Sequence, residues 1–369
     1  MKLPDKIMNM VRSCTFCYLM CRHYCTISIV QRVNQSTPTG KAMILYKLLN
    51  GEIQLNKDVA GVFYNCTNCG RCYIACETKI SNPPEWIEEA RYMLTSSGVI
   101  PEKVKALREN VLRHGNIHGL SEDRLFDKIS DMEEVCEGRS DTLYYVGGDI
   151  RSGHAEIAEK TIELFRKLSI KVKVLRDEPP DGGILYILGF RDEARRLATK
   201  LMEEIRRNGI NRVIVSDPLA YTSLKIYYPK MGIDLSGLEI VHVLELLSEK
   251  PMKFDRLAAM VVYHDPCFLG RRSTGVYEPP RMLLKKIPGL ELKETTFNRN
   301  HAFCCGGLLQ PIDEYWAKKV AEMLAERLGS KDVDFVVTAC PRCLDSLRNI
   351  GVKAVDIIEI LSEQYLSGV

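Results

Sequence analysis

The sequence lacks long hydrophobic runs and has no excess of charge of one sign. No apolar stretch approaches the roughly 18 residues that a membrane-spanning helix needs, and no signal-peptide core follows the N-terminus. The 51 basic and 48 acidic residues leave a formal net charge of +3, which argues against a nucleic-acid-binding protein. We therefore expect a cytoplasmic protein without a nucleic-acid partner. Docking at the periphery of the cytoplasmic membrane through a partner stays open.

Cysteine, by contrast, is abundant and unevenly placed. A cytoplasmic protein keeps its thiols reduced, so clustered cysteines indicate metal ligands before they indicate disulfides. Of the 14 cysteines, four fall in one N-terminal segment, four in a second, one stands alone and five lie toward the C-terminus. The N-terminal eight are Cys14, Cys17, Cys21, Cys25, Cys66, Cys69, Cys72 and Cys76.

The two N-terminal groups follow the spacing that binds four-iron clusters. The second reads C-x2-C-x2-C-x3-C, the bacterial ferredoxin pattern, and the first is the same with one extra residue in its middle. The last cysteine of such a group ligates the other cluster, so we predict two crossed 4Fe–4S sites. Site 1 comprises Cys14, Cys17, Cys21 and Cys76, and site 2 comprises Cys66, Cys69, Cys72 and Cys25.

Structural zinc is the alternative ligand for these cysteines. Zinc sites commonly join two cysteine pairs across a longer loop, whereas each group here is a single short segment. Neither group ends in the proline that usually follows the ferredoxin pattern, which weakens the match slightly. The spacing still favours iron and sulfide.

The chain between the two groups is expected to be helical. Residues 43–49 and 59–64 carry helical rather than alternating apolar patterns. This predicts an all-α ferredoxin with two 4Fe–4S clusters over residues 1–100, followed by a helical linker over residues 101–141.

After residue 140, short β-branched runs alternate with amphipathic stretches. This alternation is typical of α/β layers with mainly parallel strands. The expected strands are Leu143–Val146, Val172–Leu175, Ile184–Leu188, Val213–Val215, Met260–Tyr263 and Phe335–Val337; the expected helices are Ala155–Leu168, Asp192–Arg207 and Tyr315–Leu328. The predicted fold class is α+β multidomain, with the all-α ferredoxin first and two pseudo-repeated α/β halves after it.

An internal repeat relates the two α/β halves. Residues 213–225 resemble residues 336–348, which puts Asp217 opposite Cys340. We predict a half that lacks cysteines over 142–255 and a half with a cysteine metal site over 256–369.

Two further matches support the repeat. The segment Pro180-Asp181-Gly182-Gly183 aligns with Cys304-Cys305-Gly306-Gly307. Gly148, which follows its strand, falls near the place of Cys267.

Five cysteines of the second half form a third predicted site, site 3. Each follows a strand or lies where a strand leads into a helix, and such loops gather at one edge of an open α/β sheet. The helix that begins at Cys340 points its N-terminus there, which favours thiolates. Five thiolates are one more than a simple cube or a zinc ion takes. The ligands of site 3 are Cys267, Cys304, Cys305, Cys340 and Cys343.

These segments resemble a known family. YHDPCFLGR at 263–271, FCCGG at 303–307 and TACPRC at 338–343 resemble the cysteine-rich CCG domain. That domain occurs in the catalytic subunits of heterodisulfide reductases and in the iron–sulfur subunits of glycolate oxidase and anaerobic glycerol-3-phosphate dehydrogenase. Residues 17–23 and 66–72 resemble the same family, so the resemblance covers nearly the whole chain.

The resemblance implies a third iron–sulfur cluster at site 3, of the noncubane 4Fe–4S type. In heterodisulfide reductases this cluster is where the disulfide is cleaved. Here Phe268 stands where the family often has a second histidine, and the glycine run after Cys305 is short. These departures weigh against disulfide chemistry more than against metal binding.

Several polar residues flank the cysteines. His264 and His301 are the candidate catalytic groups: either can donate a proton to a leaving thiolate, although a hydrogen bond that orients a ligand is the favoured interpretation. Arg271 and Arg299 bind an anionic substrate or balance cluster charge. The pair Arg22-His23 is expected to tune or shield a cluster of the ferredoxin module.

The sequence carries no flavin, nicotinamide or ATP fingerprint. Gly147-Gly148 follows a strand but lacks the dinucleotide-binding register, so we interpret it as a tight turn. Iron–sulfur clusters usually pass single electrons, so a flavoprotein partner is expected to split electron pairs.

Three hypotheses follow. The chain is an electron-transfer subunit that links a flavoprotein dehydrogenase, or another redox subunit, to a quinone, a disulfide or a carrier, with a membrane quinone-reducing partner left open. Alternatively, it is a heterodisulfide-reductase-like oxidoreductase that cleaves a disulfide at site 3. In the third hypothesis site 3 holds structural zinc. The first is favoured because only one half of the repeat carries cysteines.

Overall fold

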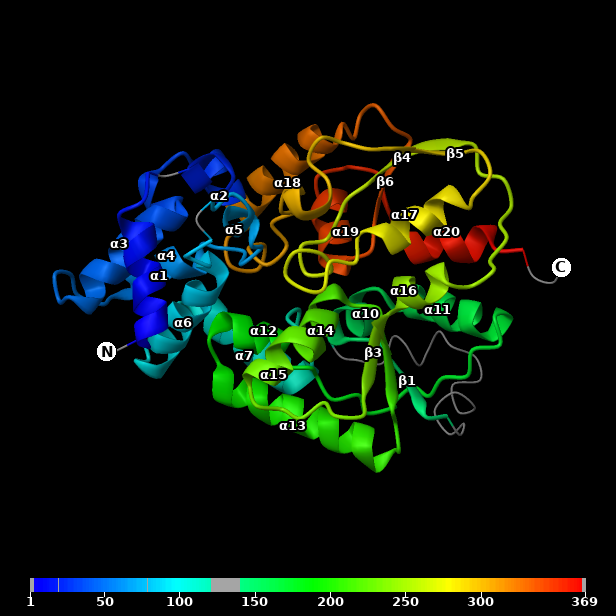
Figure 1. Ribbon diagram of the computed structural model, residues 1–369, viewed down its shortest axis with the longest axis horizontal. Helices are drawn as coiled ribbons and strands as arrows, with labels where there is room; N and C mark the ends of the chain where they lie inside the picture. The colour runs from blue at the N-terminus through cyan, green and yellow to red at the C-terminus, as the bar shows by residue number, and fades with distance from the viewer. Residues whose placement is uncertain (1–2, 19, 78, 121–139, 367–369) are drawn as a thin grey trace.

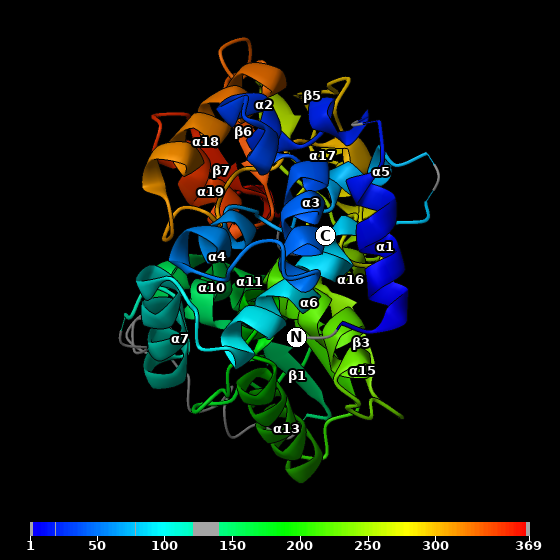
Figure 2. The ribbon, with the colours of Figure 1, turned by 90° about the vertical axis from the view of Figure 1, so that its left-hand side faces the viewer.

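The computed structural model describes residues 3–18, 20–77, 79–120 and 140–366. A helical N-terminal module lies beside two small parallel sheets (Figure 1). Figure 2 shows this module in front of both sheets. Its helices are α1 (Asp5–Thr15), α2 (Thr26–Gln31), α3 (Pro38–Leu49), α4 (Lys57–Tyr64), α5 (Arg71–Ile74), α6 (Pro83–Ser96) and α7 (Glu102–His114).

Side-chain caps begin the helices between the two cysteine groups. Thr37 accepts the N–H of Gly40 at 2.8 Å, and Pro38 takes the first position of α3, where its missing N–H removes no helical bond. Asn56 accepts the N–H of Val59 and caps α4 in the same way. The prediction of helices in this part of the chain is confirmed.

The helical module is closed by an apolar core. Val11, Leu45, Phe63 and Trp86, from four different helices, are completely buried in it. Burying side chains of this size contributes about 1.5–3 kcal/mol each. Cysteines of both N-terminal groups belong to this core or pack against it, so the core helps to position them.

The first sheet contains three parallel strands in the order β1-β2-β3. Its register places Tyr144 opposite Ile214 and Val213 opposite Ile240. The strands are β1 (Thr142–Tyr145), β2 (Arg212–Val215) and β3 (Glu239–His242). The helices around it are α10 (Gly148–Gly153), α11 (Ala155–Lys167), α12 (Gly183–Leu188), α13 (Arg191–Arg207), α14 (Pro218–Thr222), α15 (Tyr228–Lys230) and α16 (Val243–Ser248).

The second sheet contains four parallel strands in the order β5-β4-β6-β7. Val262 pairs with Val336, and Val337 pairs with Val355. The strands are β4 (Ala259–Tyr263), β5 (Leu290–Lys293), β6 (Phe335–Thr338) and β7 (Ala354–Asp356), with helices α17 (Glu278–Lys285), α18 (Glu314–Leu328), α19 (Pro341–Arg348) and α20 (Ile357–Gln364). The predicted combination of helices with parallel strands is confirmed.

The same strand-to-helix connections occur in both halves. Strand β2 leads through Asp217 into α14, and β6 leads through Cys340 into α19, and a proline opens each helix. The next strand in each half leads into a helix that begins with a capping box, at His242 for α16 and at Asp356 for α20.

Two predicted strands are wrong. Ile184–Leu188 lies in helix α12, between the left-handed glycines Gly182 and Gly189. A short, fully apolar run fits a buried strand and a buried helix equally well, so its pattern does not decide between them. Val172–Leu175 forms only an isolated bridge, between Lys173 and Leu143. No sequence pattern marked β3, β5 or β7 as strands.

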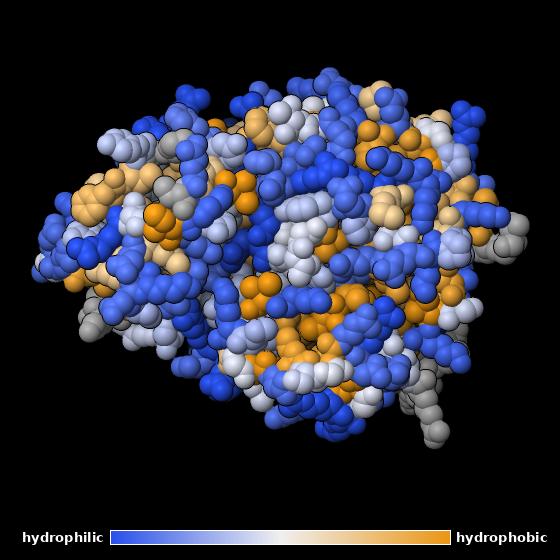
Figure 3. Space-filling view, viewed as in Figure 1, coloured by the Kyte–Doolittle hydropathy of each residue, from blue (hydrophilic) through white to orange (hydrophobic). Residues whose placement is uncertain are grey.

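In the part of the chain that the structure describes, no helix is both long and apolar enough to cross a membrane. The face shown in Figure 3 is mostly hydrophilic, with apolar side chains gathered in its lower central part. Cys136 and much of the predicted linker fall within residues 121–139, outside the described residues.

Candidate metal centres

The thiols of site 1 surround the end of α1. Cys14 lies in the last turn of this helix, Cys17 in the bend after it, Cys21 in a short 3-10 turn and Cys76 just after α5. Cys14 is buried, with its Sγ 2.9 Å from the hydroxyl of Ser81, whereas Cys17 is exposed. Site 1 is therefore the predicted site nearest to solvent.

Electrostatic interactions link the same thiols. Burial raises the pKa of Cys14, and the charges of Cys76 and Cys17 raise it further. Burial, with Cys14 and Cys25, raises the pKa of Cys21 to about 12. Without a metal, thiols with a raised pKa stay protonated at neutral pH, and a bound metal cation would deprotonate them. Arg22 and His23 share the 3-10 turn of Cys21, and His23 is exposed.

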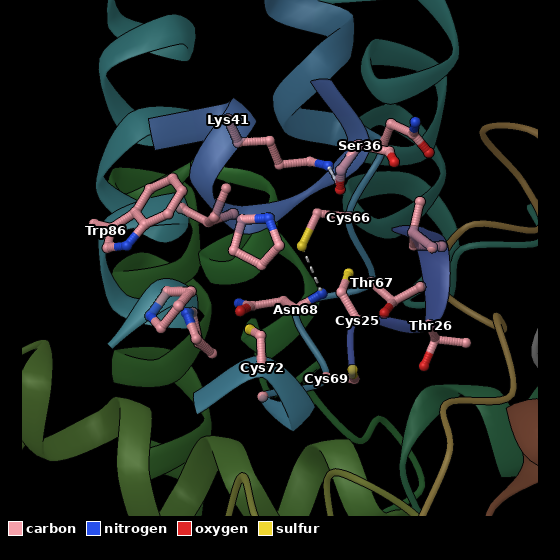
Figure 4. Close-up of a pocket in the computed structure, with 17 residues that line it drawn as sticks. Cys25, Thr26, Ser36, Lys41, Cys66, Thr67, Asn68, Cys69, Cys72 and Trp86 are labelled. Atoms are coloured by element: carbon pink, nitrogen blue, oxygen red, sulfur yellow. Dashed lines mark hydrogen bonds between the residues drawn. The ribbon is translucent and has the colours of Figure 1, made fainter. Parts of the chain in front are cut away.

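The four thiols of site 2 line one pocket (Figure 4). Cys66, Cys69 and Cys72 come from the loop around Gly70 and from α5, and Cys25 comes from the start of α2. The backbone N–H of Asn68 points at Cys66 Sγ, with an N···S distance of 3.4 Å. Hydrogen bonds to cluster sulfurs of this kind help set reduction potentials. Ligation by these four thiols stays a prediction.

A buried cation that no sequence pattern marked faces the same pocket. Lys41 of α3 is 2% exposed, and its Nζ donates to the carbonyl of Ser36 at 2.5 Å and approaches that of Gln35 at 3.5 Å (Figure 4). Burial lowers the pKa of Lys41, whereas the charges of three pocket cysteines raise it. The ammonium group therefore offsets negative charge in site 2.

The thiols of site 3 are all buried at the edge of the second sheet, on loops and at the start of α19. Cys267 follows β4, Cys340 precedes α19 and Cys343 lies in the first turn of that helix. Cys304 and Cys305 lie on the loop before α18, and Cys305 Sγ is 3.2 Å from Cys343 Sγ. The structure thus brings these thiols together from three loops.

The adjacent cysteines receive backbone hydrogen bonds. The N–H of Gly306 points at Cys304 Sγ and that of Gly307 at Cys305 Sγ, each at 3.4 Å. Gly306 has a φ of 85°, which L-residues with a side chain rarely adopt. The glycines therefore allow the loop to turn its N–H groups toward sulfur.

His264 is the buried histidine of site 3. It is 2% exposed, and within the described residues neither ring nitrogen makes a hydrogen bond of good geometry. Contacts with Cys304 and Cys343 lower the pKa of Cys305, and the His264 ring acts in the same direction. His264 is thus close enough to influence a site 3 thiol.

The loop that carries Cys267 is fixed by a buried ion pair. Asp265 and Arg281 are 2% and 1% exposed and make two contacts, of 2.7 and 2.8 Å. Asp265 also accepts the N–H of Arg299, whose guanidinium donates to Glu278 at 2.7 Å. Arg299 therefore supports the loop and is already paired with a carboxylate.

His301 is not among the buried groups. Its ring is exposed and lies edge-on to Tyr24, with ring centroids 6.3 Å apart. Its carbonyl accepts a hydrogen bond from Arg71 Nε at 3.0 Å. Of the two candidate histidines, the structure therefore buries only His264 beside the thiols.

Residues 261–348 match the model of a protein family, CCG, described as a cysteine-rich domain. The match spans β4 to α19 and contains every thiol of site 3. These residues form a CCG domain.

Curated proteins resemble the chain well beyond the CCG domain. A probable iron–sulfur-binding oxidoreductase, FadF, of Bacillus subtilis is 27% identical over 82% of this chain and 46% of its own length. One subunit of the dihydromethanophenazine:CoB–CoM heterodisulfide reductase of Methanosarcina mazei is 27% identical over 81% and 77%. EtfAB:quinone oxidoreductase of Syntrophomonas wolfei is 28% identical over 84% and 46%.

The chain thus spans less than half of two of these relatives. Among solved structures, the crystal structure of a hypothetical protein from Helicobacter pylori matches 91% of this chain and 70% of its own length. The TM-score is 0.55 at 13% identity, so this likeness concerns the fold alone.

The CCG domain contacts the loop of site 2 directly. Cys304 Sγ lies 3.2 Å from the hydroxyl of Thr67, and Cys304 also contacts Cys69. The thiols of Cys267 and Cys305, and then that of Cys69, raise the pKa of Cys304 through hydrogen bonds. The loops that carry the thiols of sites 2 and 3 are therefore in direct contact.

Two arginines, one from the CCG domain and one from the helical module, contact the loops that carry the thiols of sites 2 and 3. Arg271 of the CCG domain donates to the carbonyls of Cys69 at 2.6 Å and Ala302 at 2.8 Å. Arg71 of the helical module is buried against the ring of Phe303, 3.6 Å from its centroid. Arg271 thus balances charge between sites 2 and 3, whereas Arg71 was part of the cysteine segment at 66–72 and was given no role of its own.

The donor set of site 2 fits an iron–sulfur cluster. Among the described residues, no group of three His, Cys, Asp or Glu side chains converges on a single metal ion. In a four-iron cluster each cysteine ligates a different iron, so the thiols lie apart around a common centre. Site 2 meets this requirement, because its thiols line one pocket beside a buried lysine and a backbone N–H group directed at sulfur.

Proposed function

We propose that the chain is the iron–sulfur electron-transfer subunit of an oxidoreductase complex. It relays electrons between a flavoprotein dehydrogenase, or another redox subunit, and a quinone, a disulfide or a carrier protein. The observation that carries the proposal is the direct contact between the loops of sites 2 and 3, at Thr67, Cys69 and Cys304.

The proposal assigns a cluster to each site. A two-cluster module over residues 1–100 holds 4Fe–4S clusters at sites 1 and 2, and the second α/β half, residues 256–369, holds a third cluster at site 3. The linker over 101–141 and the half without cysteines, 142–255, bind none. When bound, the clusters supply one-electron transfer.

Buried basic side chains of the chain offset the negative charge that a cluster would bring to these sites. Lys41 places an ammonium group beside site 2, and Arg271 places a guanidinium between sites 2 and 3. Buried cations stabilise thiolates in a medium of low dielectric constant.

The partners in this proposal follow from the relatives and from the missing flavin fingerprint. The relatives' names include an EtfAB:quinone oxidoreductase and a component of heterodisulfide reductase. A chain that carries clusters without a flavin needs a flavoprotein to divide electron pairs. We place the protein in the cytoplasm, where such a partner would dock it on the membrane.

Iron, zinc and acid-labile sulfide counting on anaerobically purified protein tests the proposal. Three four-iron clusters require about 12 irons per chain. About 8 irons with one zinc would place structural zinc at site 3 and contradict it. A colourless, iron-free protein that is still active would refute the proposal entirely.

Disulfide cleavage at site 3 is the second candidate function. It is favoured by the resemblance to the Methanosarcina mazei heterodisulfide reductase chain over 77% of that protein's length, and by His264 buried beside Cys305. The reaction breaks one S–S bond, consumes two electrons and two protons and yields two thiols, and His264 is placed to deliver one proton. Thiol release from a disulfide with a chemical electron donor tests it; no release by protein with site 3 loaded would exclude it.

A further inference from the structure

The half of the repeat that lacks cysteines carries aspartates where the other half carries thiols. Asp217 occupies the place of Cys340, and Asp181 occupies the place of Cys305 in the aligned glycine segment. A third aspartate, Asp149, lies on α10, directly after β1. Carboxylates thus stand in this half at or beside the positions where the repeat places thiols in the other half.

These carboxylates gather around one cation from the other half of the repeat. Asp149, Asp181 and Asp217 line a single pocket, and Arg342 is the only basic side chain among its described lining residues. The Nη2 atom of Arg342 lies 2.5 Å from Asp149 Oδ2, and both side chains are less than a tenth exposed. Helices α10 and α19 meet at this point (Figure 1).

Arg342 also packs against a loop that carries thiols of site 3. Arg342 lies between Cys340 and Cys343 in the sequence. Gly307 is so close to it that a Cβ atom built on this glycine would lie 2.8 Å from the Cβ atom of Arg342. The loop of Cys304 and Cys305 therefore packs directly on Arg342.

Negative charges act on Arg342 both from the pocket of aspartates and from site 3. Burial lowers the pKa of Arg342, but Asp149, Asp217 and Cys340 raise it, and the net shift is upward. Burial raises the pKa of Asp217 to about 6, and Arg342 opposes this rise. Asp217 also accepts the N–H groups of Leu219 and Ala220, so its position is fixed.

We propose that the pocket of the half without cysteines is a carboxylate socket that holds Arg342, and that this socket sets the charge beside site 3. Arg342 is a positioning residue, because it acts on the cluster through the thiol loops. The proposal rests on the proposed function, since it needs a cluster at site 3. It goes beyond that function because it gives a redox role to the half that binds no metal.

The socket predicts shifts of opposite sign. Arg342 stabilises the reduced, more negative state of a cluster at site 3, so R342Q lowers the reduction potential. Asp149 offsets this positive charge, so D149N raises the potential. A purely mechanical role would loosen the same loop in both variants and would shift both potentials in one direction.

The experiment is an EPR-monitored redox titration of the full chain, purified anaerobically as wild type, R342Q, R342K and D149N. At a fixed potential we expect R342Q to change the ratio of reduced to oxidised cluster at site 3 by at least tenfold, about 59 mV for a one-electron couple. R342K keeps the charge and shifts less. The matched control R348Q, on the same helix but paired with Glu359 at the surface, leaves the potential unchanged.

Shifts of the same sign in R342Q and D149N, or no shift in either, overturn the proposal. If R342Q fails to retain iron at site 3, D149N and R342K decide: a raised potential in D149N supports the socket, and an unchanged one overturns it. A wild type that carries no cluster at site 3 instead contradicts the proposed function, and the socket's redox role with it.

Discussion

The thiol of Cys304 lies 3.2 Å from the hydroxyl of Thr67, although 237 residues separate them in the sequence. Thr67 belongs to the loop of site 2 and Cys304 to site 3. Their contact is buried, so the two predicted clusters are separated by protein atoms and not by solvent.

Replacing Thr67 by valine keeps the shape of the side chain and removes its hydrogen bond. We expect T67V to keep its iron, to lose about 1 kcal/mol of stability and to show a lower reduction potential at site 3, because the Thr67 hydroxyl would donate to the sulfur of a deprotonated, ligating Cys304 and so stabilise the reduced state. Thermal unfolding and a redox titration measure both effects. T199V, on the exposed face of α13, is the control, and equal behaviour of the two variants would contradict the account.

The crossed ligand assignment predicts which cysteine variants share a phenotype. C25S should lose the same cluster as C66S, although Cys25 belongs to the first sequence group, and C76S should lose the same cluster as C14S. Each variant is expected to lose about four irons, and EPR spectra of the reduced proteins identify the missing signal. Loss of the same signal in C25S and C14S would refute the crossing.

Lys41 is expected to raise the potential of site 2. K41M removes a buried positive charge and should lower that potential, while sites 1 and 3 stay closer to the wild-type values. Its control, K47M, changes an exposed lysine of the same helix. A shift in K47M as large as that in K41M would show that helix α3, and not the charge at Lys41, is responsible.

The sequence was informative where chemistry depends on local spacing. The ferredoxin pattern grouped Cys66, Cys69 and Cys72, which line one pocket, and the cysteines of site 3 do gather at one sheet edge. It failed at Ile184–Leu188, because an apolar run of that length has no period that separates helix from strand.

Contacts between residues that lie far apart in the sequence could not be predicted from it either. Lys41 stands in an ordinary helix, and Arg342 lies inside a cysteine motif, so nothing local marks either as a buried counter-charge. Only the packing of α3 on the loop of site 2, and of α10 on α19, brings them to their anionic partners.

A buried carboxylate makes stability depend on pH. Burial raises the pKa of Asp356, the N-cap of α20, to about 7. The folded state therefore binds more protons than the unfolded state between about pH 4 and pH 7, and stability is lost as the pH rises through this window. D356N keeps a capping residue and should remove up to about 4 kcal/mol of this penalty at pH 8, with little gain at pH 4.

Melting temperatures of D356N and wild type between pH 4 and pH 8 test this expectation. The difference should grow toward alkaline pH, with D356N the more stable protein. The exposed substitution D332N serves as the control. A difference that does not change with pH would contradict the assigned cause.

The adjacency of sites 2 and 3 is the central claim, and magnetic interaction between them tests it most directly. In EPR spectra of the fully reduced wild-type chain we expect the site 3 signal to be broadened or split by the neighbouring spin, and to become simple in C66S, which lacks the cluster of site 2. A site 3 signal that is identical in both proteins, with all clusters of the wild type present, would contradict the account.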